Sequence, residues 1–262
     1  MRLSSSAPVK CLTAFFALLW SGNLEAADEQ LDIGISTNEI AITSDFAGAD
    51  LTVFGALDNA DQFLLQIGQY DVIVALEGPE RKTIVRKKDR FFGIWINRYS
   101  MDFQPAPASY SISSTVPIDR IAKQIDLSGR TIGIEHIHLN ASGSIGDGAR
   151  VAEFRNALLR LRVASGLYQS EPVGVEFVSS SLFRATLRLP ANIPVGRHKL
   201  RAFLFKNNEY VMERQLSLRV VKTGAEQFIF ELAHKHAFLY GVLAVALAMF
   251  TGWLASVMFR RD

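Results

Sequence analysis

The first half of the chain alternates short apolar runs with turn-forming residues, and this pattern predicts strands. The predicted strands are Leu31–Ile35, Ile40–Thr43, Leu51–Ala56, Val72–Leu76, Lys82–Lys87, Phe91–Asn97 and Tyr110–Thr115. Turn formers such as Asp45, Gly48 and Gly78-Pro79 separate them. Because no helical periodicity lies between these runs, their spacing is typical of a β-sandwich or barrel rather than of alternating strands and helices.

The middle of the chain has the pattern of helices. Residues 117–125 read as a short helix with a proline near its start. A longer helix is predicted over Ala149–Ala164, where Val151, Phe154, Leu158 and Leu161 share one side and arginines lie mainly on the other. That period predicts a surface helix with one face packed on a core.

Strands return in the last third of the chain. Apolar and polar residues alternate in Phe183–Leu189 and again in Leu216–Val220, which predicts antiparallel strands with one face on a core. Asn207-Asn208 predicts a hairpin turn, since Asn tolerates positive φ. The predicted fold is therefore mainly β. It consists either of two Ig-like sandwich units, 27–116 and 169–223, joined by a helical segment 117–168, or of one sandwich with a helical insertion.

The N-terminus has the order of a secretory signal peptide, predicted over residues 1–26. Arg2 and Lys10 supply positive charge, a ten-residue apolar run follows from Cys11 to Trp20, and small residues mark a cleavage site near Ala26. The run is shorter than the roughly 20 residues that span a bilayer. A retained N-terminal anchor is the alternative.

The C-terminus carries a predicted transmembrane helix, Ala237–Phe259, after a juxtamembrane segment 224–236. Its 23 residues include no charged side chain, and at 1.5 Å per residue they span about 35 Å, enough for the hydrocarbon core. Tyr240 and Trp253 fit the two membrane interfaces. Arg260 and Arg261 in the tail 260–262 place that end in the cytoplasm by the positive-inside rule. The bulk of the chain then lies outside.

Charge and cysteine content exclude several classes of function. The formal net charge of +2 and the absence of a long basic block argue against nucleic-acid binding. The single cysteine, Cys11, lies in the predicted signal peptide, so the mature chain would have no disulfide, thiolate nucleophile or cysteine-bound metal.

Few residues suggest chemistry. His136 and His138 would lie on the same side of a strand and could share a metal ion, but two ligands are too few for a stable site and ordinary histidines are favoured. The glycine-rich loop Ser142–Gly148 before a helix suggests a phosphate cradle, yet its spacing matches no nucleotide-binding motif. Since no hydrolase motif is present either, we predict a protein that is not an enzyme and uses no cofactor.

A basic cluster precedes an aromatic one. Arg86, Lys87, Lys88 and Arg90, with Arg81 and Lys82 before them, are followed by Phe91, Phe92, Trp95 and Tyr99. One interpretation is a basic surface that faces anionic lipid headgroups or an acidic partner. The other, which is favoured, is the solvated face of a hairpin with the aromatic residues in the core.

Several segments together carry a family resemblance. They are Val53-Phe54-Gly55-Ala56, Asp71-Val72-Ile73-Val74 with Gly78-Pro79, Gly93-Ile94-Trp95-Ile96-Asn97, the run 189–196, Gly252-Trp253-Leu254-Ala255 and Phe259-Arg260-Arg261. In these the chain resembles the alphaproteobacterial transmembrane proteins of the Alph_Pro_TM type over nearly its whole mature length. The resemblance implies a Gram-negative inner membrane with the domain in the periplasm. Members are often encoded beside permeases that resemble sulfite exporters, and the family offers no catalytic residues.

The leading hypothesis is a non-enzymatic, periplasm-facing accessory protein whose partner is a multi-spanning permease. Two alternatives stay open. One is a periplasmic metal-binding protein or enzyme that uses His136 and His138, and the other is an envelope structural protein that associates with itself.

Overall fold

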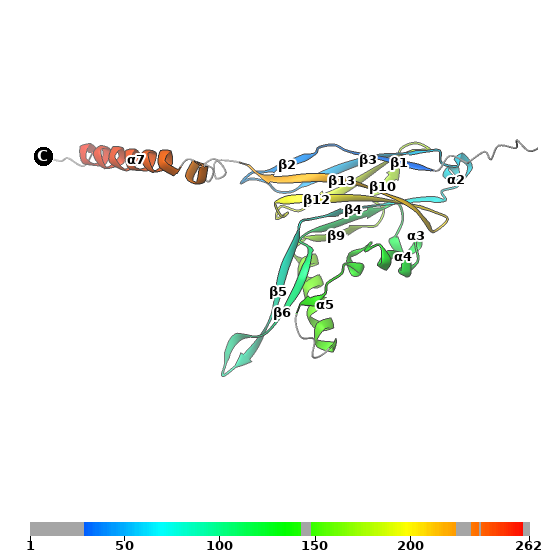
Figure 1. The fold of residues 1–262 in the computed structure, drawn as a ribbon, viewed down its shortest axis with the longest axis horizontal. Helices are drawn as coiled ribbons and strands as arrows, with labels where there is room; N and C mark the ends of the chain where they lie inside the picture. Colours follow the sequence, from blue (N-terminus) through cyan, green and yellow to red (C-terminus); the bar gives the residue numbers. More distant parts are fainter. Residues whose placement is uncertain (1–28, 143–147, 224–231, 236, 259–262) are drawn as a thin grey trace, which may run out of the picture.

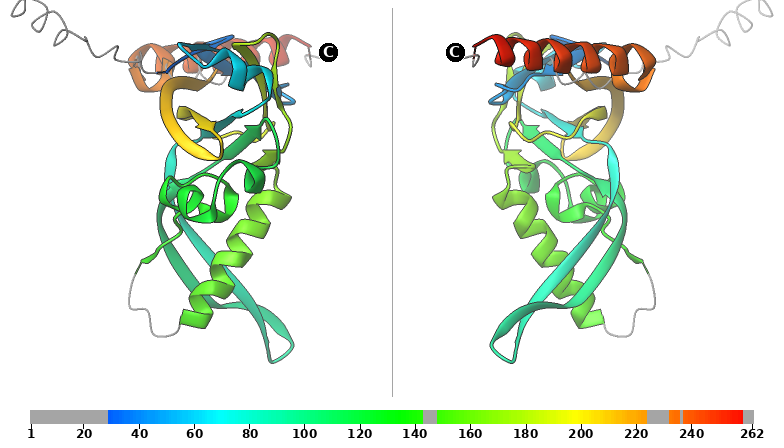
Figure 2. Two further views of the ribbon diagram at one scale, coloured as in Figure 1. Left: turned by 90° about the vertical axis from the view of Figure 1, so that its right-hand side faces the viewer. Right: turned by 90° about the vertical axis from the view of Figure 1, so that its left-hand side faces the viewer.

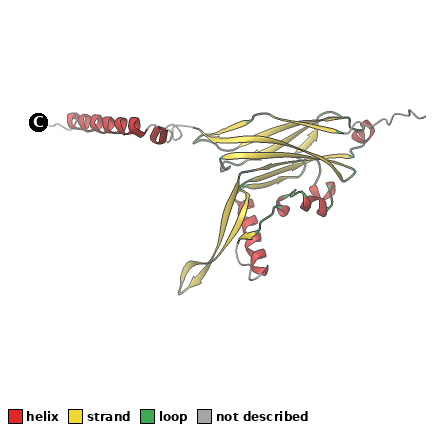
Figure 3. Cartoon of the chain, viewed as in Figure 1, coloured by secondary structure: helices red, strands yellow, loops and turns green. Residues whose placement is uncertain are grey.

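The computed structural model describes residues 29–142, 148–223, 232–235 and 237–258, and shows a β-domain followed by a single long helix (Figures 1 and 3). Two sheets form a sandwich. The first has the order β1 (Gln30–Ile35), β3 (Ala49–Asp58), β11 (Leu182–Leu189) and β10 (Val175–Phe177). The second has the order β2 (Glu39–Ile42), β13 (Glu209–Lys222), β12 (Gly196–Lys206), β4 (Tyr70–Glu77), β7 (Tyr110–Ser114) and β9 (Tyr168–Glu171).

A third, three-stranded sheet and most of the helices are added to this sandwich. The sheet consists of β5 (Glu80–Phe91), β6 (Ile94–Pro107) and β8 (Ala141–Ser142). The helices of the β-domain are α2 (Gln62–Gln66), α3 (Ile118–Ile121), α4 (Gln124–Gly129), the 3-10 helix η1 (Ile134–His136) and α5 (Gly148–Ala164). All of them except α2 lie between β7 and β9 in the sequence, so they form an insertion into the six-stranded sheet.

Both sheets of the sandwich contain strands from before the insertion and strands from after it. β11 pairs with β3 along its whole length, and β12 pairs with β4 from Lys199 to Lys206. Neither half could close its sheets alone, because its neighbouring strands come from the other half. The chain therefore folds as one sandwich with a helical insertion, the second of the two architectures that the sequence allowed.

The six-stranded sheet is buried on both faces. In β4, Val72, Val74 and Leu76 belong to the core between the two sheets, whereas Ile73 and Ala75 belong to a second core under the insertion. Successive side chains of a strand point to opposite faces, so a continuous apolar run is needed where both faces are covered. The second core also contains Phe103 of β6 and residues of α5, and it joins the insertion to the sandwich.

Most of the predicted elements are present. The helix predicted over 149–164 is α5, with Phe154 and Leu158 buried, although Leu161 is exposed. The alternation in β11 is confirmed, since its residues are exposed and buried in turn. Asn207 and Asn208 form the predicted hairpin turn with φ values of 51° and 64°. The short helix predicted over 117–125 is instead two helices, α3 and α4.

The C-terminal helix α7 (Ala237–Met258) coincides with the predicted transmembrane segment. It is 22 residues long, has a mean hydropathy of 1.9 and buries none of its residues against the described part of the chain. Length and composition therefore suit it to cross a membrane. Figure 1 shows it apart from the β-domain. The predicted signal peptide 1–26, most of the juxtamembrane segment and the tail 260–262 lie outside the described residues.

Candidate functional site

The β5–β6 hairpin extends from the sandwich as a long arm (Figure 1). It follows β4 and precedes β7, which are neighbours in the six-stranded sheet, so it leaves that sheet as an extension of two paired strands. Helix α5 lies alongside it in both views of Figure 2. We call the hairpin and α5 together the projection.

The end of the hairpin corrects one of the predicted strands. Residues Phe91–Asn97 are not one strand, because β5 ends at Phe91 and β6 begins at Ile94. Phe92 and Gly93 form the turn between them, with φ values of 48° and 82°. Positive φ at both central residues is the pattern of a tight type I′ hairpin turn, which matches the twist of the flanking strands.

The aromatic residues of this segment are exposed, so the prediction that they lie in the core is wrong. Phe92 is 90% exposed, Trp95 66% and Phe91 49%, and the neighbouring aliphatic residue Ile94 is 67% exposed. We call these four residues the tip. Large apolar side chains gathered at the end of an extended hairpin are uncommon on a surface that meets only water.

The strand register shows which basic residues share a face with the tip. Directly opposite residues of an antiparallel pair lie on the same face, and Arg90 is opposite Trp95. Strand alternation places Arg86 and Lys88 on that outer face too. We call Arg86, Lys88 and Arg90 the basic stripe. Lys87 points to the other face, where its Nζ contacts the Glu153 carboxylate of α5 at 2.6 Å.

Helix α5 braces the other face of the hairpin. The Arg162 guanidinium donates hydrogen bonds to the Ala108 carbonyl at 3.1 Å and to Thr83 Oγ1 at 3.2 Å. Farther out, the Arg150 guanidinium lies 5.7 Å from the Tyr99 ring centre. These contacts are spread along the hairpin, so α5 holds it as an arm of fixed direction.

A polar network lies on the six-stranded sheet at the edge of the second core. Arg201 of β12 donates to Glu77 Oε1 at 2.8 Å, to Glu213 Oε1 at 2.8 Å and to Glu213 Oε2 at 3.1 Å. It also donates to the Arg130 carbonyl at 3.1 Å, which ties the end of α4 to the sheet. Because the Arg201 guanidinium is matched with two carboxylates and one carbonyl of the chain itself, this network reads as structural.

The contacts of this network shift the pKa values of Arg201 and Glu213. Burial alone would lower the pKa of Arg201, but its hydrogen bonds to Glu213 and Glu77 raise it. Burial would raise the pKa of Glu213, but the hydrogen bond from Arg201 lowers it. Both shifts favour the charged forms of Arg201 and Glu213.

The histidines predicted as weak metal candidates do not lie on a strand. His136 ends the 3-10 helix η1, which follows Gly133 with a φ of 101°, and His138 is exposed with its Nδ1 3.3 Å from Thr131 Oγ1. In the part of the chain that the structure describes, no three His, Cys, Asp or Glu side chains are grouped so that they could hold a metal ion. The glycine-rich loop cannot be placed, since residues 143–147 lie outside the described ranges.

His198, in contrast, is buried. It is 1% exposed, with Nε2 3.4 Å from Ser109 Oγ and Nδ1 3.4 Å from the Gly196 carbonyl. Burial lowers its pKa, and the contact with the Gly196 carbonyl opposes this only in part. The folded protein thus holds His198 neutral in a range where the unfolded chain takes up a proton.

We expect His198 to make the protein less stable in acid. Its folded pKa lies below the unfolded value of 6.5, so its effect is absent at higher pH and grows as pH falls below 6.5. The loss is at most about 1.4 kcal/mol per pH unit. Denaturation midpoints of the detergent-solubilised chain between pH 8 and 5 should fall less steeply in His198→Gln than in the wild type. Equal slopes would contradict this account.

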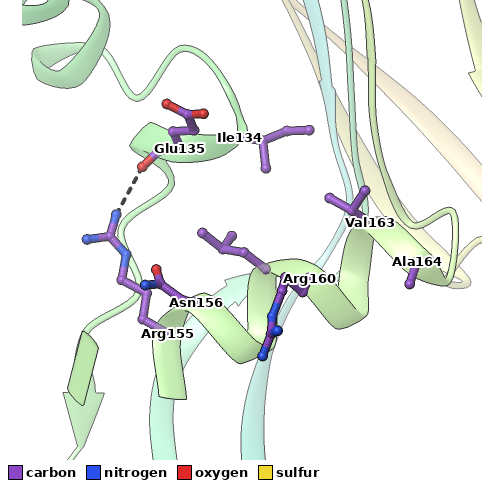
Figure 4. Close-up of a pocket in the computed structure, with 8 residues that line it drawn as sticks. Ile134, Glu135, Arg155, Asn156, Arg160, Val163 and Ala164 are labelled. Atoms are coloured by element: carbon purple, nitrogen blue, oxygen red, sulfur yellow. Dashed lines mark hydrogen bonds between the residues drawn. The ribbon is translucent and has the colours of Figure 1, made fainter. Parts of the chain in front are cut away.

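A shallow groove of about 730 Å³ lies between α5 and η1 (Figure 4). Ile134, Val163 and Ala164 line it, and Arg155 closes one end by donating a hydrogen bond to the Glu135 carbonyl at 2.9 Å. Figure 4 shows the Arg160 side chain pointing away from the groove. Nothing else on this surface indicates what would fill it.

The membrane residues are placed only in part. Tyr240 and Trp253 lie toward the two ends of α7 and are exposed, and their role at the membrane interfaces stays a prediction. Arg260 and Arg261 lie outside the described residues. The exposed tip was the feature that sequence reasoning missed, and its available signal was Gly93 directly after two phenylalanines.

Comparison with known proteins identifies the family. A family model described as "Putative transmembrane protein (Alph_Pro_TM)" matches residues 30–261. The chain belongs to this family. The match covers both the β-domain and α7, so this member of the Alph_Pro_TM family combines a β-rich domain with one apolar helix and is membrane-anchored. No curated protein matches this chain.

Among solved structures, this Alph_Pro_TM protein is similar to two bacterial surface proteins. AggA, the major subunit of aggregative adherence fimbriae type I from Escherichia coli, is 7% identical with a TM-score of 0.27. That match covers 75% of this chain and 96% of AggA. The N-terminal domain of the Streptococcus gordonii adhesin Sgo0707 is 11% identical with a TM-score of 0.25, over 73% of this chain and 32% of that one. Neither likeness is close enough to indicate function.

Proposed function

We propose that this protein is a non-enzymatic accessory protein of the inner membrane that binds a multi-spanning permease through its projection. One observation carries this proposal. A braced hairpin extends from the β-domain of a membrane-anchored chain, and it exposes a basic stripe and an apolar tip that the described fold leaves uncovered. Surfaces of this composition, with aromatic and arginine side chains together, are typical of binding sites.

Three features support the location and the kind of partner. The positive-inside rule, applied to Arg260 and Arg261, supports a C-terminus in the cytoplasm and a β-domain in the periplasm. The anchor keeps the projection beside the membrane, which favours a partner in the same bilayer. The family resemblance implies genes beside permeases that resemble sulfite exporters, and this favours a partner of that kind.

The test is an affinity purification of the tagged full chain from gently solubilised membranes, with partners identified by mass spectrometry. We expect a multi-spanning permease in near-stoichiometric amount. The variant Arg86→Glu/Lys88→Glu reverses the charge of the basic stripe and should lose the permease. The matched control Arg188→Glu/Lys199→Glu changes two exposed basic residues of the sandwich and should keep it.

Other outcomes would reject the proposal in distinct ways. A wild-type preparation that contains this chain alone would remove the permease as partner. Crosslinks between copies of this chain, and to nothing else, would favour the self-associating envelope protein. Metal retained in stoichiometric amount and lost in His136→Ala/His138→Ala would favour the metal-binding alternative.

A further inference from the structure

One residue of the tip, Phe92, has a backbone conformation that phenylalanine rarely adopts. Phe92 occupies the first turn position at a φ of 48°, where Asn or Gly is usual because bulky side chains rarely adopt the left-handed region. Its ring is 90% exposed and meets the Phe91 ring at a centroid distance of 4.5 Å. The turn would form at least as well with Asn. The phenylalanine therefore points to a contact outside the described chain.

The apolar side chains of the tip lie on both faces of the hairpin and at its apex. Phe91 and Ile94 are opposite each other and share the face toward α5, Trp95 is on the outer face, and Phe92 is at the apex. A flat protein surface would contact only one face of such a hairpin. A lipid bilayer surrounds whatever enters it, so it can cover both faces and the apex at once.

The charge near the tip suits an anionic membrane. Residues 81–99 contain seven Lys or Arg and one acidic residue, although the whole chain has a net charge of only +2. That acidic residue, Asp89, is paired with Arg98 at 3.0 Å. Within the described residues neither Lys88 nor Arg90 forms an ion pair, so both can contact lipid phosphates.

The spacing of charge and apolar surface also fits a bilayer. At about 3.4 Å per residue, Arg90 is about 7 Å and Lys88 about 14 Å from Phe92 along β5. Interfacial segments bury their apolar side chains roughly 5–10 Å deep, and the headgroup layer is roughly 5–8 Å thick. When the tip is at that depth, Arg90 lies among the phosphates and Lys88 at the outer border of the headgroups.

We infer that the tip inserts into the interfacial layer of an anionic lipid bilayer, with Arg90 and Lys88 at the headgroup phosphates. The hairpin is then a second membrane contact that orients the β-domain, in addition to α7. Because α7 already holds the domain at the surface, the tip needs only modest affinity of its own. This inference rests on one part of the proposed function, the membrane anchor. It does not depend on the permease.

Trp95 provides a direct probe. The chain has three tryptophans, so in the Trp20→Phe/Trp253→Phe background Trp95 is the only one. The full chain is reconstituted into vesicles of phosphatidylcholine, with or without phosphatidylglycerol, and with brominated acyl chains as quenchers. We expect the Trp95 emission to shift to the blue and to be quenched in vesicles that contain phosphatidylglycerol, and to a several-fold smaller extent in phosphatidylcholine alone.

Two variants separate the apolar and the charged contributions. Phe92→Ser/Ile94→Ser should abolish both the shift and the quenching, and it should leave the fold intact because both side chains are exposed. In Lys88→Glu/Arg90→Glu, the Trp95 shift and quenching should no longer depend on phosphatidylglycerol. High salt should have the same effect on the chain with an unchanged basic stripe, because it screens the attraction between the stripe and the lipid. The control Arg188→Glu/Lys199→Glu should behave like the parent.

The alternatives give different results. Trp95 emission that stays water-like and unquenched in every vesicle would overturn the inference. A blue shift that arises in native membranes but not in pure lipid would also overturn it, and would assign the tip to a protein partner. Quenching in pure lipid combined with a purification that yields no permease would keep the lipid contact and reject only the proposed function.

Discussion

Replacing Arg201 with methionine is expected to lower the free energy of unfolding by about 3–5 kcal/mol, because it leaves two carboxylates without their cation. The side chains of Arg201, Glu77 and Glu213 are only 15%, 16% and 16% exposed. Water can therefore replace few of the hydrogen bonds that the guanidinium donates to the two carboxylates. The measurement is chemical denaturation of the detergent-solubilised chain, followed by the circular dichroism of the sheets.

The same account predicts how the effect can be reversed. Removing all three charges, in Arg201→Met/Glu77→Leu/Glu213→Leu, should be less destabilising than Arg201→Met alone, since no unpaired carboxylate stays buried. The exposed pair of Arg184 and Glu176 serves as control, and Arg184→Met should change the free energy of unfolding by less than about 1 kcal/mol. A triple variant no more stable than the single one would refute this explanation.

Acid should weaken the effect of Arg201→Met. The hydrogen bond from Arg201 lowers the pKa of Glu213 against the effect of burial. A group with a lowered folded pKa contributes stability above its ordinary value, here 4.5, and loses it as pH falls through the folded value. The difference between wild type and Arg201→Met should therefore be full at neutral pH and shrink below pH 4.5.

This network also shows what one sequence cannot predict. The alternation in β11 and the Asn207-Asn208 turn are local signals, and the structure confirms both. The contact of Arg201 with Glu77, in contrast, depends on the pairing of β12 with β4 across the whole insertion. No local pattern specifies which distant strands pair. For the same reason, the sequence could not distinguish a single sandwich from two sandwich units.

The tip departs from the sequence prediction for a different reason. Phe91, Phe92 and Trp95 have high strand propensity, so the segment Phe91–Asn97 reads as one buried strand when tertiary context is unknown. Gly93 was the only local indication of a turn, and a Phe at positive φ is contrary to the usual turn chemistry. Sequence rules fail most often where residues serve something other than folding. Their failure at the tip agrees with a binding role there.

The projection should depend on the second core more than the sandwich does. Phe103 of β6 is 1% exposed and packs in the second core with Val85 of β5 and Phe154 of α5. Phe103→Ala should lower the free energy of unfolding by about 3–5 kcal/mol through the lost apolar contacts and the cavity. Its effect should be concentrated where those contacts are, in β5, β6 and α5.

Hydrogen exchange of the full chain, read by mass spectrometry, tests this distribution. In Phe103→Ala, exchange should rise first in β5, β6 and α5, while β1, β3 and β11 stay protected. The matched control is Phe183→Ala, which removes an equally buried ring from the core between the two sheets and should give the opposite pattern. If both variants instead raise exchange uniformly, the two cores unfold as one unit through the sheet they share. If the patterns differ, the hairpin that carries the tip can loosen while the sandwich stays folded. Phe103→Ala can then be used to test whether the tip must be held rigid in order to bind.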